Sequence, residues 1–314
     1  MELEGIVLRA VCGVYSVHAE GRVVHCVLRG NLKKEFEYSG GARPRVTRVR
    51  RHPGRDTLAV GDRVRIVVGP HGNGVIEDVL PRRSRFSRSG FRGREHTVVC
   101  NLDLVVIVSS CAEPRPDPWK LDRFLVAAEA EGLDTVVAVN KTDLLPDQPL
   151  ADFEEFVEVG YTVLPVSAHT GDGLRQLQEA VAGKVSAFVG ASGVGKSSLL
   201  NALHPGLNLR TGEIGRVTWK GRHTTTASQL IPLRCGGWVA DTPGLRRFEL
   251  ADLVREEIAD CFPEFRPYIG QCRFDDCRHE SEPGCAVRDA VECGRIRSRR
   301  YESFRIMAAE AEAV

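Results

Sequence analysis

Two periodicities of apolar residues divide this chain. Residues 3–80 alternate apolar and polar positions in short runs that break at glycines, as in GIVLRAVCGVYSVHA and RVVHCVLRG. Alternation with period two predicts half-buried strands. About five such strands fit a small barrel, and we expect an OB-type β-barrel. An SH3-like barrel fits the alternation nearly as well.

From residue 102 the pattern changes to continuous apolar runs. LDLVVIVSS (102–110) is typical of a strand buried on both faces, and similar runs follow at 135–139, 162–166, 185–189 and 237–240. Between them apolar residues recur at helical spacing, for example Leu121, Phe124, Leu125 and Ala128. Strands that alternate with helices predict an α/β domain with a parallel sheet. The tail from residue 251 is predicted to be mostly helical.

Two segments carry strong loop signals, and the second suggests a domain boundary. SGGARPRVTRVRRHPGRD (39–56) is rich in Gly, Pro and Arg, and we interpret it as a mobile basic loop. PRRSRFSRSGFRGREH (81–96) is interpreted as a basic linker. We therefore expect a barrel at 1–82, an α/β domain at 97–250 and a helical domain at 251–314.

Charge is distributed unevenly along a chain whose net charge is only +1. Residues 1–100 hold 19 Lys and Arg against 10 Asp and Glu, whereas residues 101–260 hold 15 against 22. A basic first third predicts contact with a polyanion, and RNA is the expected one. A basic face that is merely solvated is the simpler alternative.

Composition favours a cytoplasmic protein, and we expect a monomer. No run of eighteen apolar residues is present, and the first residues lack the basic and apolar blocks of a signal peptide. Ten cysteines in such a chain are not expected to form a disulfide framework. Seven are scattered singly, and the other three cluster with a histidine.

A phosphate-binding loop is the strongest motif. Residues 190–197 fit G-x-x-x-x-G-K-[ST], and they follow the predicted strand VSAFV. Backbone N–H groups of such a loop surround phosphates, the lysine neutralises them, and the hydroxyl binds Mg²⁺. The predicted phosphate-binding residues are Gly190, Ala191, Ser192, Gly193, Val194, Gly195, Lys196, Ser197 and Ser198.

Two further segments complete a nucleotide site. Asp241-Thr-Pro-Gly244 follows a predicted strand, so Asp241 is expected to hold Mg²⁺ and the Gly244 N–H to meet the γ-phosphate. Between the two motifs lies a run of three threonines, Thr224, Thr225 and Thr226, where a γ-phosphate-sensing switch is expected. The predicted magnesium ligands are Ser197, Thr225 and Asp241.

The base reader comes earlier in the chain. Asn140, Lys141, Thr142 and Asp143 form N-K-x-D at the end of a predicted strand, and Ser167-Ala168 ends the next one. A carboxylate accepts two hydrogen bonds from the N–H groups of guanine, which adenine cannot donate. The motif therefore predicts GTP and disfavours ATP.

The parts of a GTPase are thus all present, but in a rotated order. In NKTD, SAHTGDGL, GASGVGKSSLLNAL, GRHTTT, DTPG and CRFDDCRHESEPGCAV the chain resembles the circularly permuted GTPases of the RsgA (YjeQ) type. The resemblance covers essentially the whole chain. It implies a barrel, a permuted GTPase domain and a zinc-binding tail. It also implies GTP hydrolysis stimulated by the small ribosomal subunit, rRNA binding and a role in late maturation of that subunit.

The cysteine cluster is a predicted zinc site. Cys272, Cys277, His279 and Cys285 offer three thiolates and one imidazole, a set that suits tetrahedral Zn²⁺. The spacing is not that of a standard zinc finger, and reduced cysteines near a surface histidine are the simpler alternative. The resemblance favours zinc, in a structural role.

Catalysis needs a group that Ras-like GTPases supply differently. Leu245 follows Asp-x-x-Gly at the position of their water-orienting glutamine, and leucine cannot hydrogen-bond water. His223 in the switch is our candidate, and the resemblance indicates the same residue. A histidine that only packs on the switch or contacts RNA is equally compatible with the sequence.

Two other functions stay open. One is a nucleotide-gated RNA-binding assembly factor that turns over little GTP. The other is a permuted GTPase that acts on the large subunit or in another RNA process.

Overall fold

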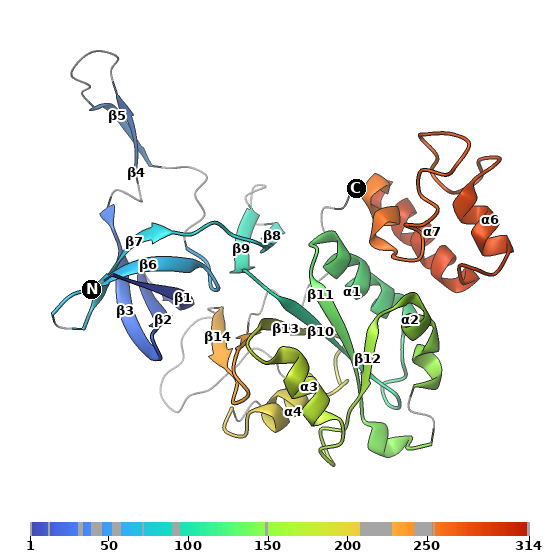
Figure 1. The fold of residues 1–314 in the computed structure, drawn as a ribbon, viewed down its shortest axis with the longest axis horizontal. Helices are drawn as coiled ribbons and strands as arrows, with labels where there is room; N and C mark the ends of the chain where they lie inside the picture. Colours follow the sequence, from blue (N-terminus) through green and yellow to red (C-terminus); the bar gives the residue numbers. More distant parts are fainter. Residues whose placement is uncertain are drawn as a thin grey trace. The chain divides into compact units, whose positions relative to one another are not determined.

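The computed structural model describes residues 2–11, 13–30, 34–38, 46–51, 58–70, 72–89, 95–147, 150–207, 228–241, 253 and 255–312. They belong to two compact units, coloured along the sequence in Figure 1. The first contains residues 1–102, 222–232 and 238–244, and the second contains the rest of the chain. Among the described residues no helix is long and apolar enough to cross a membrane.

Five strands of the first unit close a barrel. They are β1 (Glu2–Val11), β2 (Val14–Ala19), β3 (Arg22–Leu28), β6 (Arg63–Val68) and β7 (Gly74–Val79). Their order is β1-β2-β3-β7-β6, and β6 returns to β1. Only β3 and β7 pair in parallel; the other pairs are antiparallel. This five-stranded closure confirms the predicted barrel, and its parallel pair favours the Greek-key OB arrangement over an SH3-like one.

The barrel core consists of the inward positions of the predicted alternation. Val7, Val17, Val64, Ile66 and Ile76 are fully buried. At its edge the buried Asp62 accepts two hydrogen bonds from Arg82, at 2.7 and 2.8 Å, and one from the Ala59 N–H. This ion pair fixes the chain where it leaves the barrel.

Two segments predicted to be irregular contain strands. Residues 46–51 form β5 (Val46–Arg51), paired with β4 (Lys34–Tyr38), so the loop prediction for 39–56 was wrong there. Likewise β8 (Arg85–Ser89), inside the predicted linker at 81–96, pairs with β9 (Glu95–Cys100), which begins at the end of that linker. In both hairpins, pairing with a partner strand overrides the loop tendency of glycine- and arginine-rich sequence, because strand propensity depends strongly on context.

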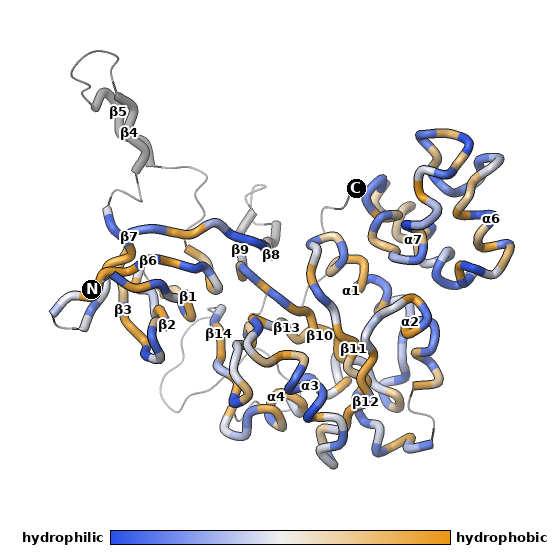
Figure 2. The backbone as a smooth tube through the Cα atoms, in the orientation of Figure 1, coloured by the Kyte–Doolittle hydropathy of each residue, from blue (hydrophilic) through white to orange (hydrophobic). Residues whose placement is uncertain are grey.

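The second unit is built on four parallel strands. β10 (Leu104–Ser110) lies between β11 (Asp134–Asn140) and β13 (Val185–Val189), and β12 (Thr162–Pro165) follows β11. β10, β11 and β13 are buried along most of their length, and β10 and β11 appear as largely orange tubes in Figure 2. The predicted parallel sheet is confirmed, and all carboxyl ends lie at one edge.

Four helices accompany these strands, on two sides of the sheet in Figure 1. α1 (Pro118–Ala130) contacts β10 and β11, and α2 (Glu154–Val159) contacts β12. α3 (Leu174–Val181) contacts α4 (Lys196–Leu203), the helix that begins inside the phosphate-loop motif. This is the α/β arrangement that the spacing of apolar residues predicted.

The two strands that lead into the predicted Asp241-Thr-Pro-Gly244 motif lie in the first unit. β14 (Gln229–Pro232) pairs with β15 (Trp238–Asp241) and, through Gln229, with Arg9 of β1. The strand predicted at 237–240 is therefore confirmed with a shift of one residue, and Asp241 is its last residue.

The C-terminal region has its own apolar core. α5 (Arg255–Ile258), α6 (Ala286–Glu292) and α7 (Ser298–Glu312) surround Phe262, Phe265 and Phe304, which are buried. Cys285 belongs to this core, and Cys272 and Cys277 pack against it. The predicted helical tail is confirmed, and its cysteine cluster is part of the core.

A buried ionic cluster fastens this region to α1. Asp122 of α1 accepts a 2.6 Å hydrogen bond from Arg300 and bonds of 2.6 and 3.2 Å from Arg299, both on α7. Arg300 also binds Glu264 through two hydrogen bonds, at 2.6 and 3.0 Å. Asp122 and Arg300 are fully buried.

The surroundings keep Arg300 charged. Burial acts to lower the pKa of Arg300, but the hydrogen bond to Glu264 and the charges of Asp122 and Glu264 raise it above its ordinary value. The guanidinium also lies 4.7 Å from the ring centre of Phe262. Removing one partner of such a cluster leaves an uncompensated buried charge, which is more costly than the loss of the pair itself.

We predict that Arg300→Ala lowers the free energy of unfolding by about 3–5 kcal/mol. Arg297→Ala is the matched control, because Arg297 binds Glu158 with both side chains more than half exposed, and we expect no resolvable change. Urea unfolding of both variants tests this. Equal unfolding midpoints for the two variants would show that the buried cluster does not stabilise the chain.

Candidate nucleotide and metal sites

The phosphate loop connects β13 to α4 in the second unit. Gly190 has a φ of 139°, and a Cβ there would meet the Val108 carbonyl oxygen at 2.2 Å, so this position requires glycine. Ser197 lies in the first turn of α4 and is buried. The Lys196 ammonium donates to the carbonyl oxygens of Gly190 and Ala191, at 2.8 and 2.5 Å, within its own loop. The Lys196 ammonium is therefore bound by carbonyl oxygens of the phosphate loop itself.

Asn140, at the end of β11, links the base-reading loop to the phosphate loop. Its Nδ2 donates to the Val194 carbonyl at 2.8 Å, and its Oδ1 accepts the Ala168 N–H at 3.1 Å. The side chain is 2% exposed. Asn140 therefore holds three loops together, and since an amide has two N–H donors and two acceptor lone pairs, these two bonds do not preclude a contact with the base.

Asp143 is the group that can accept hydrogen bonds from guanine. Its Oδ1 accepts a 2.6 Å bond from Ser167 Oγ. Ser167 is fully buried, and its hydroxyl also accepts the N–H groups of His169 and Thr170. The predicted second base loop is thus a turn that orients the Asp143 carboxylate.

Lys141 stands between the two loops. Its backbone is left-handed, with a φ of 69° and a ψ of 29°, and the following residues Thr142–Leu144 form a short 3₁₀ turn. Its ammonium donates to the carbonyl oxygens of Gly193, at 2.8 Å, and of Glu113. The Lys141 side chain therefore extends from the end of β11 to the phosphate loop.

Sequence reasoning overlooked the turn after β10 that contacts this loop. Cys111 donates its N–H to the Asn140 carbonyl at 3.1 Å and its thiol to the Lys141 carbonyl at 3.2 Å. A single cysteine outside any motif gives no sequence signal for such a role. Only the pairing of β10 with β11 places it there.

Asp241 is described within the first unit. It is buried, ends β15 and accepts a 3.5 Å hydrogen bond from the Gln229 amide. Its carboxylate oxygens are donors of the kind that Mg²⁺ prefers, and within the second unit the buried Ser197 hydroxyl is another such donor. The other residues predicted for the phosphate and magnesium sites, His223, Thr224, Thr225, Thr226 and Gly244, lie outside the described residues.

The cysteine cluster has the geometry of a metal site. The ligand atoms of Cys272, Cys277, His279 and Cys285 all lie within 4.8 Å of one another. His279 Nδ1 is 3.5 Å from the Cys272 sulfur and 3.4 Å from the Cys285 sulfur. Tetrahedral Zn²⁺ with bonds of about 2.0–2.3 Å places its donors about 3.5–3.8 Å apart. The four predicted ligands therefore fit zinc and leave no position for a catalytic water.

Neighbouring groups hold the cluster in shape. Burial lowers the pKa of His279, which favours the neutral imidazole that binds metals. Burial also raises the pKa of the Cys277 thiol to about 12, so a metal would have to displace its proton on binding. The Glu282 carboxylate accepts the N–H groups of Arg278, Glu280 and Ser281. Although burial opposes it, this bonding lowers the pKa of Glu282 to about 2. The Tyr301 hydroxyl donates to the His279 carbonyl at 2.6 Å.

Comparisons with known proteins agree with this geometry. Residues 79–251 match the family model described as RsgA GTPase. A protein of Moorella thermoacetica named "Small ribosomal subunit biogenesis GTPase RsgA" is 44% identical over 312 residues, which cover 99% of this chain and 98% of the relative. One of the same name from Gemmatimonas aurantiaca is 45% identical over 306 residues, covering 96% of this chain and 94% of the relative.

Two solved structures share the whole fold. "Crystal structure of YjeQ from Thermotoga maritima" superposes with a TM-score of 0.80 at 35% identity and covers 100% of both chains. "The crystal structure of YloQ, a circularly permuted GTPase" gives 0.76 at 30% identity and covers 100% of this chain and 96% of that one.

The base-reading strand precedes the phosphate-loop strand in sequence but lies in the same parallel sheet, which defines a circularly permuted P-loop GTPase domain. With the barrel before it and the cysteine–histidine cluster after it, the architecture predicted from sequence is confirmed. The chain belongs to the RsgA GTPase family and is a GTP hydrolase.

We predict that Gly195→Ala weakens GDP binding about tenfold or more. Gly195 has a φ of 97°, and a Cβ there would meet Asn140 Nδ2 at 2.2 Å, so the new methyl group displaces the amide that links the loops. Fluorescence titration with a labelled GDP measures the affinity. Gly160→Ala is the matched control, since φ is 105° and no atom lies within 4 Å of the added Cβ. Similar GDP affinities for the two variants would contradict the role given to Asn140.

Zinc content gives a second test. We expect about one Zn²⁺ per chain in the purified protein, and Cys277→Ser should lose most of it because one of four donors is replaced. Cys293→Ser is the control, as Cys293 is exposed and lies outside the cluster. Elemental analysis with a thermal melt follows both zinc and fold. A wild-type chain that takes up no zinc, even when zinc is added, would refute the site.

Proposed function

We propose that this GTPase acts in maturation of the small ribosomal subunit, binding that subunit through its rRNA and hydrolysing GTP faster when bound to it. The observation that carries the proposal is the near full-length similarity to proteins named for small-subunit biogenesis, together with a base reader and a phosphate loop joined through Asn140. The division of labour is a barrel at 1–82 that binds RNA, a GTPase domain at 97–250 and a zinc-binding domain at 251–314.

The proposal assigns a role to each site residue. Asp143 accepts the N–H groups of guanine, while Ser167 and Ala168 fix the loops around the base. The N–H groups of residues 190–198 surround the phosphates, and Lys196 exchanges its carbonyl partners for phosphate oxygens. Ser197, Thr225 and Asp241 would hold Mg²⁺, which neutralises charge on the β- and γ-phosphate oxygens.

Hydrolysis requires a group that orients water, and Leu245 cannot do so. We assign this step to His223, whose imidazole would hold the attacking water in line with the γ-phosphate when the subunit is bound. The proposal explains why turnover without the subunit should be slow. It also makes the RNA-bound state the hydrolytically competent one.

RNA binding is assigned to the basic first third of the chain. Excess arginine in residues 1–100 favours contacts with phosphates, whose strength falls steeply with salt. Six arginines of the predicted loop contribute to this charge: Arg43, Arg45, Arg48, Arg50, Arg51 and Arg55. Arg48, Arg50 and Arg51 lie on β5, and the other three lie outside the described residues.

Steady-state GTP hydrolysis with purified ribosomal subunits tests the proposal. We expect small subunits to raise the rate about tenfold or more, large subunits to leave it unchanged, and His223→Ala to abolish the stimulation. The stimulation should weaken as salt is raised. Stimulation by large subunits alone would redirect the proposal to that particle.

A protein that binds GTP but is not stimulated would instead be a nucleotide-gated RNA-binding assembly factor. The leucine at position 245 is the observation that keeps this second function in view. In that case the role of His223 is withdrawn, whereas the nucleotide site itself stands.

A further inference from the structure

The turn that follows β10 contacts the base-reading loop through Cys111 and Glu113. Cys111 N–H donates to the Asn140 carbonyl at 3.1 Å, and the Cys111 thiol donates to the Lys141 carbonyl at 3.2 Å. The Glu113 carbonyl accepts the Lys141 ammonium. One short turn therefore binds the backbone carbonyls of Asn140 and Lys141 and the ammonium of Lys141.

Lys141 needs such support because of its backbone. A φ of 69° in a residue with a Cβ is costly, by about 1–2 kcal/mol, and persists only where the surroundings impose it. The Lys141 carbonyl accepts the Leu144 N–H at 2.9 Å, which closes the turn that carries Asp143. The Cys111 thiol donates to this same carbonyl. It thus acts on the residue whose conformation starts the turn.

The thiol is suited to a donor role at neutral pH. Cys111 is 6% exposed, and burial raises the pKa of its thiol, so the S–H is retained. A thiol is a weak donor compared with a hydroxyl. Replacement by serine should therefore keep or strengthen the bond, while alanine and valine remove it.

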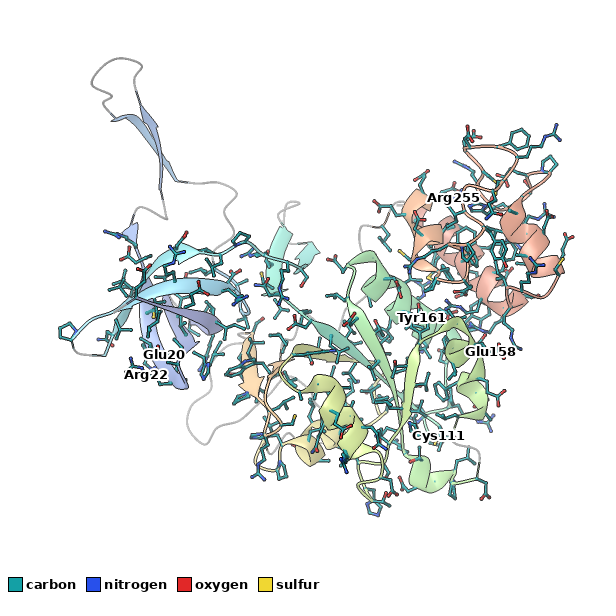
Figure 3. The ribbon with its side chains drawn as sticks, in the orientation of Figure 1. Glu20, Arg22, Cys111, Glu158, Tyr161 and Arg255 are labelled. Atoms are coloured by element: carbon teal, nitrogen blue, oxygen red, sulfur yellow. The ribbon has the colours of Figure 1, made fainter. Side chains whose placement is uncertain are left out.

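Cys111 is buried at the wall of a cavity. Cys111, labelled in Figure 3, lines this cavity of about 740 Å³ together with Leu145, Asp152 and Arg297. The turn therefore borders a cavity and is linked to residues 140 and 141 by hydrogen bonds. These bonds distinguish Cys111 from a cysteine that only fills a core.

We propose that Cys111 is a positioning residue of the guanine site, holding Asn140 and Lys141 in the conformation that presents the Asp143 carboxylate to the base. Cys111 does not touch the nucleotide; it acts through the two carbonyl oxygens that it binds. The proposal rests on the assignment of residues 140–143 as the guanine reader.

The test compares Cys111→Ala, Cys111→Val and Cys111→Ser by titration with labelled GDP and by steady-state GTP hydrolysis. We expect alanine and valine to raise the Kd for GDP and the KM for GTP about three- to tenfold, with kcat unchanged at saturation. Serine should bind like the wild type. Valine fills the space without donating, so it separates the lost hydrogen bond from the lost volume.

Cys261→Ala is the matched control. Cys261 is also buried, and its thiol donates to the Glu257 carbonyl at 3.2 Å, but in the C-terminal region away from the base reader. It should change thermal stability without changing the Kd for GDP. Wild-type affinity in the alanine and valine variants would overturn the proposal, and so would a serine variant as weak as alanine. A wild-type chain without preference for guanine nucleotides would instead overturn the assignment of the reader.

Discussion

The nucleotide site depends on one amide. Asn140 occupies the end of a strand and bonds at once to the phosphate loop, through the Val194 carbonyl, and to the second base loop, through the Ala168 N–H. These loops lie 54 and 28 residues from it in sequence. These hydrogen bonds join loops at the ends of neighbouring strands, so they do not depend on the order of the loops along the chain. A circular permutation therefore leaves the site intact, provided that the parallel strands keep their neighbours.

The tail is attached by a different kind of interaction. Arg299 and Arg300 of α7 both bind Asp122 of α1. Arg297 binds Glu158 of α2, and Glu158 is labelled in Figure 3. The metal cluster and the aromatic core build a compact C-terminal region, and the ionic cluster fixes that region to the helix following the turn at Cys111. The nucleotide-binding sheet and the C-terminal region therefore belong to one compact unit, connected by the buried Asp122–Arg300 pair and by the exposed Arg297–Glu158 pair.

Much of this architecture could be predicted from sequence. Continuous apolar runs identified β10, β11 and β13, because strands buried on both faces are apolar at almost every position. Helical spacing of apolar residues identified α1 and α3, because a helix buried on one face is apolar on that face. The four clustered cysteine and histidine residues were found because these residue types have few other reasons to gather, and their geometry is consistent with a zinc site. The hairpins β4–β5 and β8–β9 were missed, since their stability comes from pairing with a partner strand. The roles of Asn140 as a bridge and of Cys111 as a support were missed too, as both depend on neighbours far away in sequence.

The central claim is that the rotated motifs form a single guanine-reading site with Asp143 as the reader. The most direct measurement is competition between GDP and XDP for the wild-type chain and for Asp143→Asn. Asparagine offers an N–H₂ donor where aspartate accepts, which suits the extra carbonyl of xanthine and not the amino group of guanine. The account predicts that the wild type prefers GDP and that the variant prefers XDP, with its fold intact. An Asp143→Asn chain that still prefers GDP would contradict it.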